Sequence, residues 1–210
     1  MGQDSSPAAG LQTRSPAENF LSPQALLQVP QTRKLPHLYF AGHPIFITFR
    51  LHGSLPPGRA FPKETTSGEA FLAMDTLLDH AQQGPLHLKF PEIASIVHAS
   101  LHHCSRENYA LHAWALMPNH VHMLITPQTD VPAFMRRLKG FSARKANEFL
   151  NRVGQPFWQG ESYDHLVRSP EEFRNIERYI LNNPVKAGLV HTPGAYAWSS
   201  AGGSGDPPQV

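Results

Sequence analysis

Apolar runs of strand length alternate, in the central part of the chain, with longer segments whose apolar residues recur at helical spacing. Residues 45–51 are β-branched and aromatic and lie between turn residues, which predicts a first strand. Residues 69–83 and 91–106 carry apolar side chains three and four positions apart, so each predicts a helix. Two more strands are expected at 109–116 and 120–126, joined by a tight Met-Pro-Asn connection.

The C-terminal part continues the alternation. Residues 131–153 predict a helix and residues 163–168 a short strand. A last helix is expected over 170–183, with Ser169 as its N-cap and Pro184 ending it. The succession of strands and helices indicates an α+β fold in which an antiparallel sheet carries its helices on one face.

Composition separates this region from the two ends of the chain. Residues 1–33 are rich in Ser, Pro and Gln and show no periodicity, which is typical of a disordered segment, and residues 200–210 have the same character. The 210 residues include 20 Pro and 15 Gly, which crowd toward the ends and dilute the overall hydrophobic fraction of 40%. We therefore expect a single folded domain over residues 34–199.

Charge and cysteine content exclude several classes of protein. The formal net charge is only +2, so a site for a polyanion requires local clustering of cations. The single cysteine, Cys104, excludes an internal disulfide framework and a thiolate zinc site. Because the sequence shows neither a signal-peptide core nor an apolar run of about 18 residues, we expect a cytoplasmic protein with no membrane partner.

Two histidines stand out within an apolar run, at 120 and 122. On a strand both imidazoles point to the same side, because side chains alternate with a period of two. Burying two rings there is costly unless a ligand or a hydrogen bond compensates them. His120 and His122 are therefore candidate metal ligands, although ordinary half-buried histidines are the alternative.

Tyr179 and Asn183 supply complementary chemistry. They are four residues apart in a predicted helix, so the phenol and the carboxamide share one face. Two imidazole nitrogens and one amide oxygen would leave open positions on Mg²⁺ or Mn²⁺, where a phosphate could bind. The alternative is that Tyr179 is a core aromatic residue and Asn183 a helix-end residue before Pro184.

Taken together and in this order, the motifs of the chain resemble those of the REP-associated tyrosine transposases, a branch of the single-tyrosine HUH transposase superfamily. The resemblance covers roughly residues 34–200. The motifs that carry it are Arg33–His37, Met117–His122, Trp158-Gln159, Tyr163–Arg168 and Tyr179–Val190.

The resemblance implies a ferredoxin-like HUH nuclease fold and a metal-dependent enzyme that cleaves and rejoins single-stranded DNA, with hairpin or palindromic repeats as substrates. Carried over by position, it makes His120, His122 and Asn183 the ligands of Mg²⁺ or Mn²⁺. Tyr179 becomes the nucleophile that forms a 5′-phosphotyrosine. Single-stranded or hairpin DNA is the implied partner, and a monomer or a homodimer is compatible with the sequence.

Two further groups of residues are candidates for supporting roles. A basic helix face without acids is a plausible track for a DNA backbone, or simply a solvated surface; it comprises Arg136, Arg137, Lys139, Arg144 and Lys145. Three polar residues ahead of the last helix could orient DNA or the metal ligands, or form a structural ion pair; they are Asp164, His165 and Arg168.

Two other functions stay open at this point. A catalytically silent protein that grips DNA hairpins would keep the same fold. A histidine-triad nucleotide hydrolase would need a third alternating histidine, and position 124 is Leu. Segment 54–90 is longer than a minimal domain of this kind needs, and it is either a recognition insert or packing.

Overall fold

The computed structural model describes residues 39–55, 67–80 and 84–202 of the chain. The segment 1–33, the Arg33–His37 motif and residues 203–210 of the predicted tail lie outside the described residues. No helix in the described ranges is long and apolar enough to cross a membrane.

The sheet has four strands in the order β2-β3-β1-β4. The central pair consists of β1 (Ile45–Arg50) and β3 (His120–Pro127), and the edges are β2 (Tyr109–Leu116) and β4 (Tyr163–Leu166). Every neighbouring pair is antiparallel. The predicted α+β class with an antiparallel sheet is thus confirmed.

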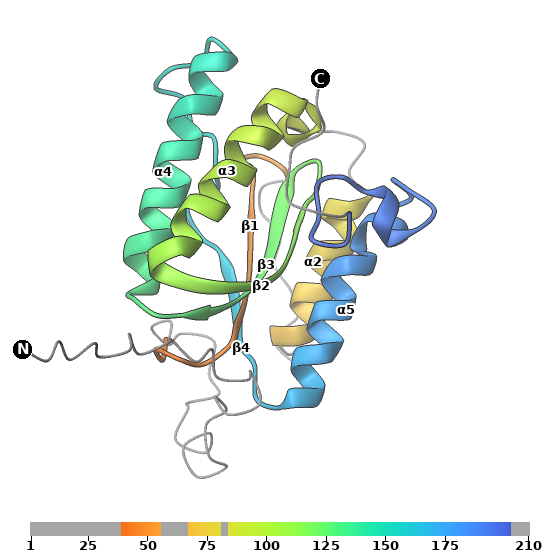
Figure 1. Ribbon diagram of the computed structural model, residues 1–210. Coiled ribbons are helices and arrows are strands. Elements are labelled where there is room, and N and C mark those ends of the chain that lie inside the picture. Colours follow the sequence, from red (N-terminus) through yellow and green to blue (C-terminus); the bar gives the residue numbers. More distant parts are fainter. Residues whose placement is uncertain (1–38, 56–66, 81–83, 203–210) are drawn as a thin grey trace, which may run out of the picture.

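Helices cover both faces of this sheet rather than one (Figure 1). On one face lie α3 (Pro91–Asn108) and α4 (Val131–Phe149), and on the other lie α2 (Ser67–Asp79) and α5 (Pro170–Lys186). We call these the α3/α4 face and the α2/α5 face. The physical reason for the two layers is that β3 is buried along its whole length, so both of its faces need a covering helix.

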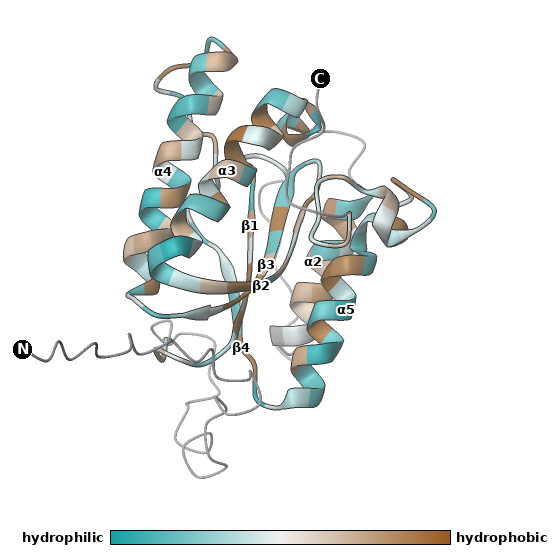
Figure 2. Cartoon of the chain, in the orientation of Figure 1, coloured by the Kyte–Doolittle hydropathy of each residue, from teal (hydrophilic) through white to brown (hydrophobic). Residues whose placement is uncertain are grey.

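The α3/α4 face holds the larger hydrophobic core. Alternate residues of β1, including Ile47 and Phe49, pack there against side chains such as Leu101 and Phe134. Trp158 lies in the same cluster, with its ring centroid 4.8 Å from that of Phe49. Figure 2 shows the resulting pattern, in which hydrophobic positions gather toward the inside of the molecule and hydrophilic positions toward its outside.

The last helix differs from its prediction at its C-terminal end. Ser169 is the N-cap, as predicted, and its Oγ accepts a hydrogen bond from Glu172 N–H at 3.1 Å. Pro184 does not end the helix but lies inside it, because the N–H groups that follow still find carbonyl partners in the last turn. The chain leaves the helix at Gly188, whose φ of 70° favours glycine. This extra turn brings Lys186 into the helix.

One other helix and one strand end earlier than predicted. The helix expected to reach residue 153 ends at Phe149, and Asn151 then adopts a positive φ of 55°. The strand expected over 163–168 ends at Leu166. At the far edge of the sheet, Trp198 C=O accepts a hydrogen bond from Leu116 N–H at 2.8 Å, so residues near the C-terminus cover β2.

Candidate metal and nucleophile site

His120 and His122 lie side by side on the α2/α5 face of the central strand β3. Both side chains are fully buried, and their Nε2 atoms are 3.0 Å apart. The sheet makes room for them, because His122 lies between Ala115 of β2 and Thr48 of β1, two small residues. The shared orientation predicted from their spacing is therefore the one that the structure shows.

Each imidazole is held through its Nδ1 atom. His120 Nδ1 lies 2.7 Å from Asn119 Oδ1, and His122 Nδ1 lies 2.7 Å from Thr48 Oγ1. Asn119 donates its amide hydrogen to Leu78 C=O at 3.0 Å, so its Oδ1 accepts and His120 Nδ1 donates. Burial of the ring and the electrostatic effect of the nearby His122 together lower the pKa of His120 to about 3. The neutral His120 ring thus presents the lone pair of Nε2 to the site.

Asp75 of α2 is the residue that the sequence interpretation missed. Its buried Oδ1 lies 3.2 Å from His122 Nε2 and 3.6 Å from His120 Nε2, and it has no hydrogen-bond partner. Burial opposes ionisation of Asp75, but the two histidines, with Lys186, outweigh it and lower the pKa of the carboxyl group. One sequence signal was available: an acid on the buried side of an otherwise apolar helix, beside Phe71 and Leu78.

Tyr179 and Asn183 approach the histidines from α5, and both contact Asp75. The Tyr179 hydroxyl donates a hydrogen bond to Asp75 Oδ2, and Asn183 Nδ2 donates to the same oxygen at 3.3 Å. Asn183 Oδ1 is buried without a hydrogen-bond partner. The structure thus brings the predicted nucleophile and all three predicted metal ligands to one place, around a carboxylate.

A second buried acid, Asp79, and the cation Lys186 lie at the edge of the site. Asp79 lies one helical turn after Asp75, and its Oδ1 is 3.9 Å from His120 Nε2. Burial and the nearby Asp75 raise the pKa of Asp79 to about 6. Lys186 Nζ lies 3.3 Å from Asp79 Oδ2 and 5.7 Å from the centroid of the Tyr179 ring. The extra turn of α5 therefore supplies a cation to a site rich in acceptors.

The donor set fits a divalent cation. One ligand atom from each of His120, His122 and Asp75 lies within 4.8 Å of the others, so the three side chains could bind one ion. Two ligands about 2.1 Å from an ion and at right angles are about 3.0 Å apart. The distances of 3.0 Å between the Nε2 atoms and 3.2 Å from His122 to Asp75 suit this requirement. The amide and carboxylate oxygens suit Mg²⁺ or Mn²⁺, and the imidazole nitrogens suit transition-metal ions, so the mixed set favours Mn²⁺ of the two.

The basic face predicted as a DNA track lies on α4, on the opposite side of the sheet from the histidines. Three of its cations have protein partners: Lys139 donates to Gln159 C=O at 2.7 Å, Arg137 to Asn108 Oδ1 at 2.6 Å and Lys145 to Glu148 at 2.8 Å. The remaining two, Arg136 and Arg144, are exposed, and the Arg144 guanidinium lies 5.6 Å from the centroid of the Phe141 ring. The structure does not bring these five residues to the metal and nucleophile site.

The three polar residues ahead of α5 also divide between the faces. His165 pairs with Phe46 and Asp164 with Ile47 across β1, so their side chains point to opposite sides of the sheet. Glu172 joins the other two, because His165 Nε2 lies 2.8 Å from its Oε1 and Arg168 N–H donates to its Oε2 at 2.6 Å. This contact ties the chain to the first turn of α5.

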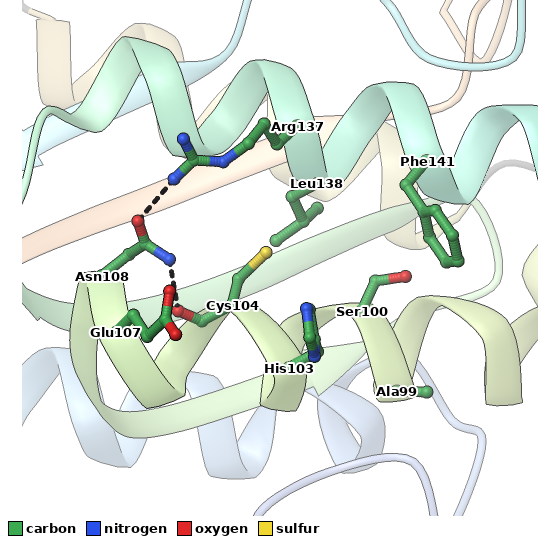
Figure 3. Close-up of a pocket in the computed structure, with 9 residues that line it drawn as sticks. All are labelled: Ala99, Ser100, His103, Cys104, Glu107, Asn108, Arg137, Leu138 and Phe141. Atoms are coloured by element: carbon green, nitrogen blue, oxygen red, sulfur yellow. Dashed lines mark hydrogen bonds between the residues drawn. The ribbon is translucent and has the colours of Figure 1, made fainter.

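A hollow of about 650 Å³ lies between α3 and α4 (Figure 3). Cys104 and Phe141 are among the residues that line it, and a hydrogen bond from Arg137 to Asn108 crosses one end. Because both helices cover the α3/α4 face, this hollow is separated by the sheet from the histidines.

Comparison with known proteins finds similarity to transposases over part of the chain. The family model described as "Transposase IS200 like" matches residues 92–183. Over 83 residues the chain is 28% identical to the REP-associated tyrosine transposase of Escherichia coli K12, which covers 39% of this chain and 48% of that protein. Over 71 residues it is 37% identical to the ISDra2 transposase TnpA of Deinococcus radiodurans, covering 31% of this chain and 51% of that protein.

The chain thus spans about half the length of these curated relatives. Among solved structures, a REP-associated tyrosine transposase bound to a REP hairpin has the same fold, with a TM-score of 0.51 and 17% identity. The match covers 80% of this chain and 82% of that one. The segment matched by the family model holds the two histidines, Tyr179 and Asn183, whereas Asp75 precedes it.

Proposed function

We propose that this chain is an IS200-like transposase, a metal-dependent enzyme that cleaves and rejoins single-stranded DNA, with hairpin or palindromic repeats as substrates. The observation that carries this proposal is the convergence of His120, His122, Tyr179 and Asn183 on one buried site. The hairpin bound to the solved transposase of the same fold supports the choice of substrate.

In this proposal His120 Nε2, His122 Nε2 and Asn183 Oδ1 hold Mg²⁺ or Mn²⁺. The bound ion would polarise the scissile phosphate and stabilise the charge that develops on it. Asn119 and Thr48 fix the orientation of the two imidazoles through their Nδ1 atoms, which directs both Nε2 atoms into the site.

Tyr179 is the proposed nucleophile. Its phenolic oxygen forms a bond to phosphorus while the bond from phosphorus to the 3′ oxygen breaks, which leaves a 5′-phosphotyrosine and a free 3′-hydroxyl. The phenol loses one proton and the departing 3′ oxygen gains one, so protons balance. Because the link to Tyr179 remains a phosphodiester, the 3′-hydroxyl of another strand can reverse the attack, and the strands are rejoined without an external energy source.

DNA contacts outside the reacting centre are proposed for the cations predicted from the sequence. On α4 the exposed Arg136 and Arg144 are the best placed, because Arg137, Lys139 and Lys145 already donate hydrogen bonds to protein groups, whereas Arg144 only lies over the exposed Phe141 ring. Arg168, with Asp164 and His165 beside it, would contact DNA near the start of α5. Charge removal at a backbone contact should weaken binding and reduce its salt dependence.

The test is formation of a covalent adduct. The protein is incubated with Mn²⁺ or Mg²⁺ and a pool of end-labelled single-stranded hairpins, and the products are separated under denaturing conditions. We expect an adduct that requires the metal and disappears in Tyr179→Phe. The matched control is Tyr163→Phe, which removes a hydroxyl from the same face of the sheet and should leave the adduct intact.

Two outcomes would contradict the proposal in different ways. An adduct that persists in Tyr179→Phe would exclude this nucleophile. Tight binding of hairpins without any adduct would favour the catalytically silent hairpin-binding protein. If an adduct forms, a mixture of the His120→Ala and Tyr179→Phe proteins tests whether one chain forms the site alone. Activity restored in the mixture would mean that two chains contribute residues to one site.

A further inference from the structure

We propose that Asp75 is a further metal ligand and that its second carboxylate oxygen positions Tyr179, so that one side chain of α2 couples the metal to the nucleophile. This inference rests on the proposed function and deepens it. It concerns a residue that lies outside the segment matched by the family model.

The first support is the environment of Asp75 Oδ1. The Asp75 side chain is fully buried, and this oxygen lies 3.2 Å and 3.6 Å from the Nε2 atoms of His122 and His120. It has no hydrogen-bond donor among the described residues. A fully buried carboxylate oxygen beside two imidazole nitrogens is unfavourable unless a cation or a proton lies between them. Asp75 Oδ1 therefore points into the position that the two histidines would share with a metal ion.

The second support is the environment of Asp75 Oδ2. This oxygen accepts hydrogen bonds from the Tyr179 hydroxyl and from Asn183 Nδ2, both on α5. One oxygen of the carboxylate thus faces the two histidines, and the other contacts the predicted nucleophile and Asn183. Because a carboxylate is rigid and planar, this bridge fixes how far the phenolic oxygen lies from the metal position.

Charge is the third support. Two neutral imidazoles and an amide would leave the full positive charge of a divalent ion in a buried site. A carboxylate ligand offsets half of that charge and strengthens binding, and two histidines with one carboxylate form a ligand set used for divalent transition metals. Lys186 forms its ion pair with Asp79 rather than with Asp75, so the charge of Asp75 is available to a metal ion.

The experiment measures binding of Mn²⁺ to the whole chain without DNA. Electron paramagnetic resonance follows the loss of the free Mn²⁺ signal as protein is added, for wild type, Asp75→Asn, Asp79→Asn and His120→Ala. We expect affinity to fall at least tenfold in Asp75→Asn and His120→Ala, and less than threefold in Asp79→Asn. Asp79→Asn is the matched control, since it removes the same charge one turn away on the same helix.

A second measurement does not depend on how well Asp75→Asn folds. Wild-type and Asp79→Asn proteins are labelled with ¹³C at the aspartate carboxyl groups and loaded with Mn²⁺. Electron–nuclear double resonance should then show a ¹³C coupling to Mn²⁺ in both proteins. No such coupling in either protein would overturn the inference.

The outcomes separate this inference from the proposed function. If His120→Ala loses Mn²⁺ while Asp75→Asn retains it at wild-type affinity, the inference fails and the proposed histidine site stands. If wild-type protein binds no Mn²⁺, both fail. A wild-type metal site that depends on Asp75 but gives no DNA adduct would sustain the inference and contradict the proposed transposase reaction.

Discussion

Both faces of the sheet are buried and carry a hydrophobic cluster, yet the α2/α5 face also holds the buried histidines and acids of the site. Neighbouring residues of β1 illustrate this contrast, because Phe49 packs against Trp158 on the α3/α4 face while Thr48 contacts His122 on the α2/α5 face. Along β3, Val121 and Met123 join the hydrophobic core, whereas the alternating His120 and His122 face Asp75. One strand therefore contributes to stability through one face and to the site through the other.

The difference shows that burial serves two purposes in this protein. On the α3/α4 face it removes hydrocarbon from water, which is the main source of folding free energy. On the α2/α5 face it also removes polar groups from water, which is unfavourable unless each finds a partner. Among the described residues, most of the buried side-chain atoms without a hydrogen bond belong to Asp75, Asp79 and Asn183. The proposed metal ion would provide partners for some of these atoms.

The largest expected effect is on the hydrophobic face. Phe49→Ala should lower the free energy of unfolding by about 3–5 kcal/mol, because it removes a fully buried ring and leaves a cavity beside Trp158. Urea denaturation followed by circular dichroism measures the change. A loss below about 1 kcal/mol would mean that this face is not the main source of stability.

Thr48, next to Phe49 in β1, tests the α2/α5 face. Thr48→Val keeps the shape of the side chain but removes the oxygen that holds His122 Nδ1, so Mn²⁺ affinity should fall about 10- to 100-fold. The unfolding free energy should change by less than it does in Phe49→Ala. Isothermal titration calorimetry gives the affinity, and an unchanged value would show that the histidine needs no support from Thr48.

A polar contact within the hydrophobic face should have a smaller effect than loss of the ring. Ser142→Ala leaves the buried Trp158 Nε1–H without its acceptor at 3.0 Å, which should cost about 1–3 kcal/mol. Urea denaturation again measures the loss. Mn²⁺ affinity should stay at its wild-type value, because Ser142 lies on α4 across the sheet from the histidines, and a drop in affinity would show that the two faces are coupled.

The smallest effect concerns pH. Burial of Glu172 opposes its ionisation, but its hydrogen bonds with His165 and with Arg168 N–H outweigh that and lower the pKa of the carboxyl group below 4.5. A lowered pKa stabilises the folded state above pH 4.5, and this contribution disappears as the pH falls through the folded-state value. Glu172→Gln should therefore reduce the loss of stability below pH 4.5. Thermal unfolding between pH 3 and 7 tests this, and parallel curves for the two proteins would contradict it.

Much of the secondary structure was predictable from local patterns. The β2–β3 hairpin, α3 and the N-cap of α5 agree closely with the sequence, because periodicity and capping depend on residues near each other in the chain. The end of α5 was not predictable, since the last turn continues past Pro184 to Gly188 through backbone hydrogen bonds. The helices cover both faces of the sheet rather than the one face predicted, because hydrophobic patterns do not specify which face a helix packs against.

The sequence by itself determined that His120 and His122 share a side of a strand and that Tyr179 and Asn183 share a face of a helix. Each of these is a consequence of the geometry of one element. Only the tertiary structure decided that the two pairs meet, and that Asp75 lies between them. A contact between α2 and β3 joins residues far apart in the chain, and it depends on how helices pack on the sheet, which no local spacing specifies.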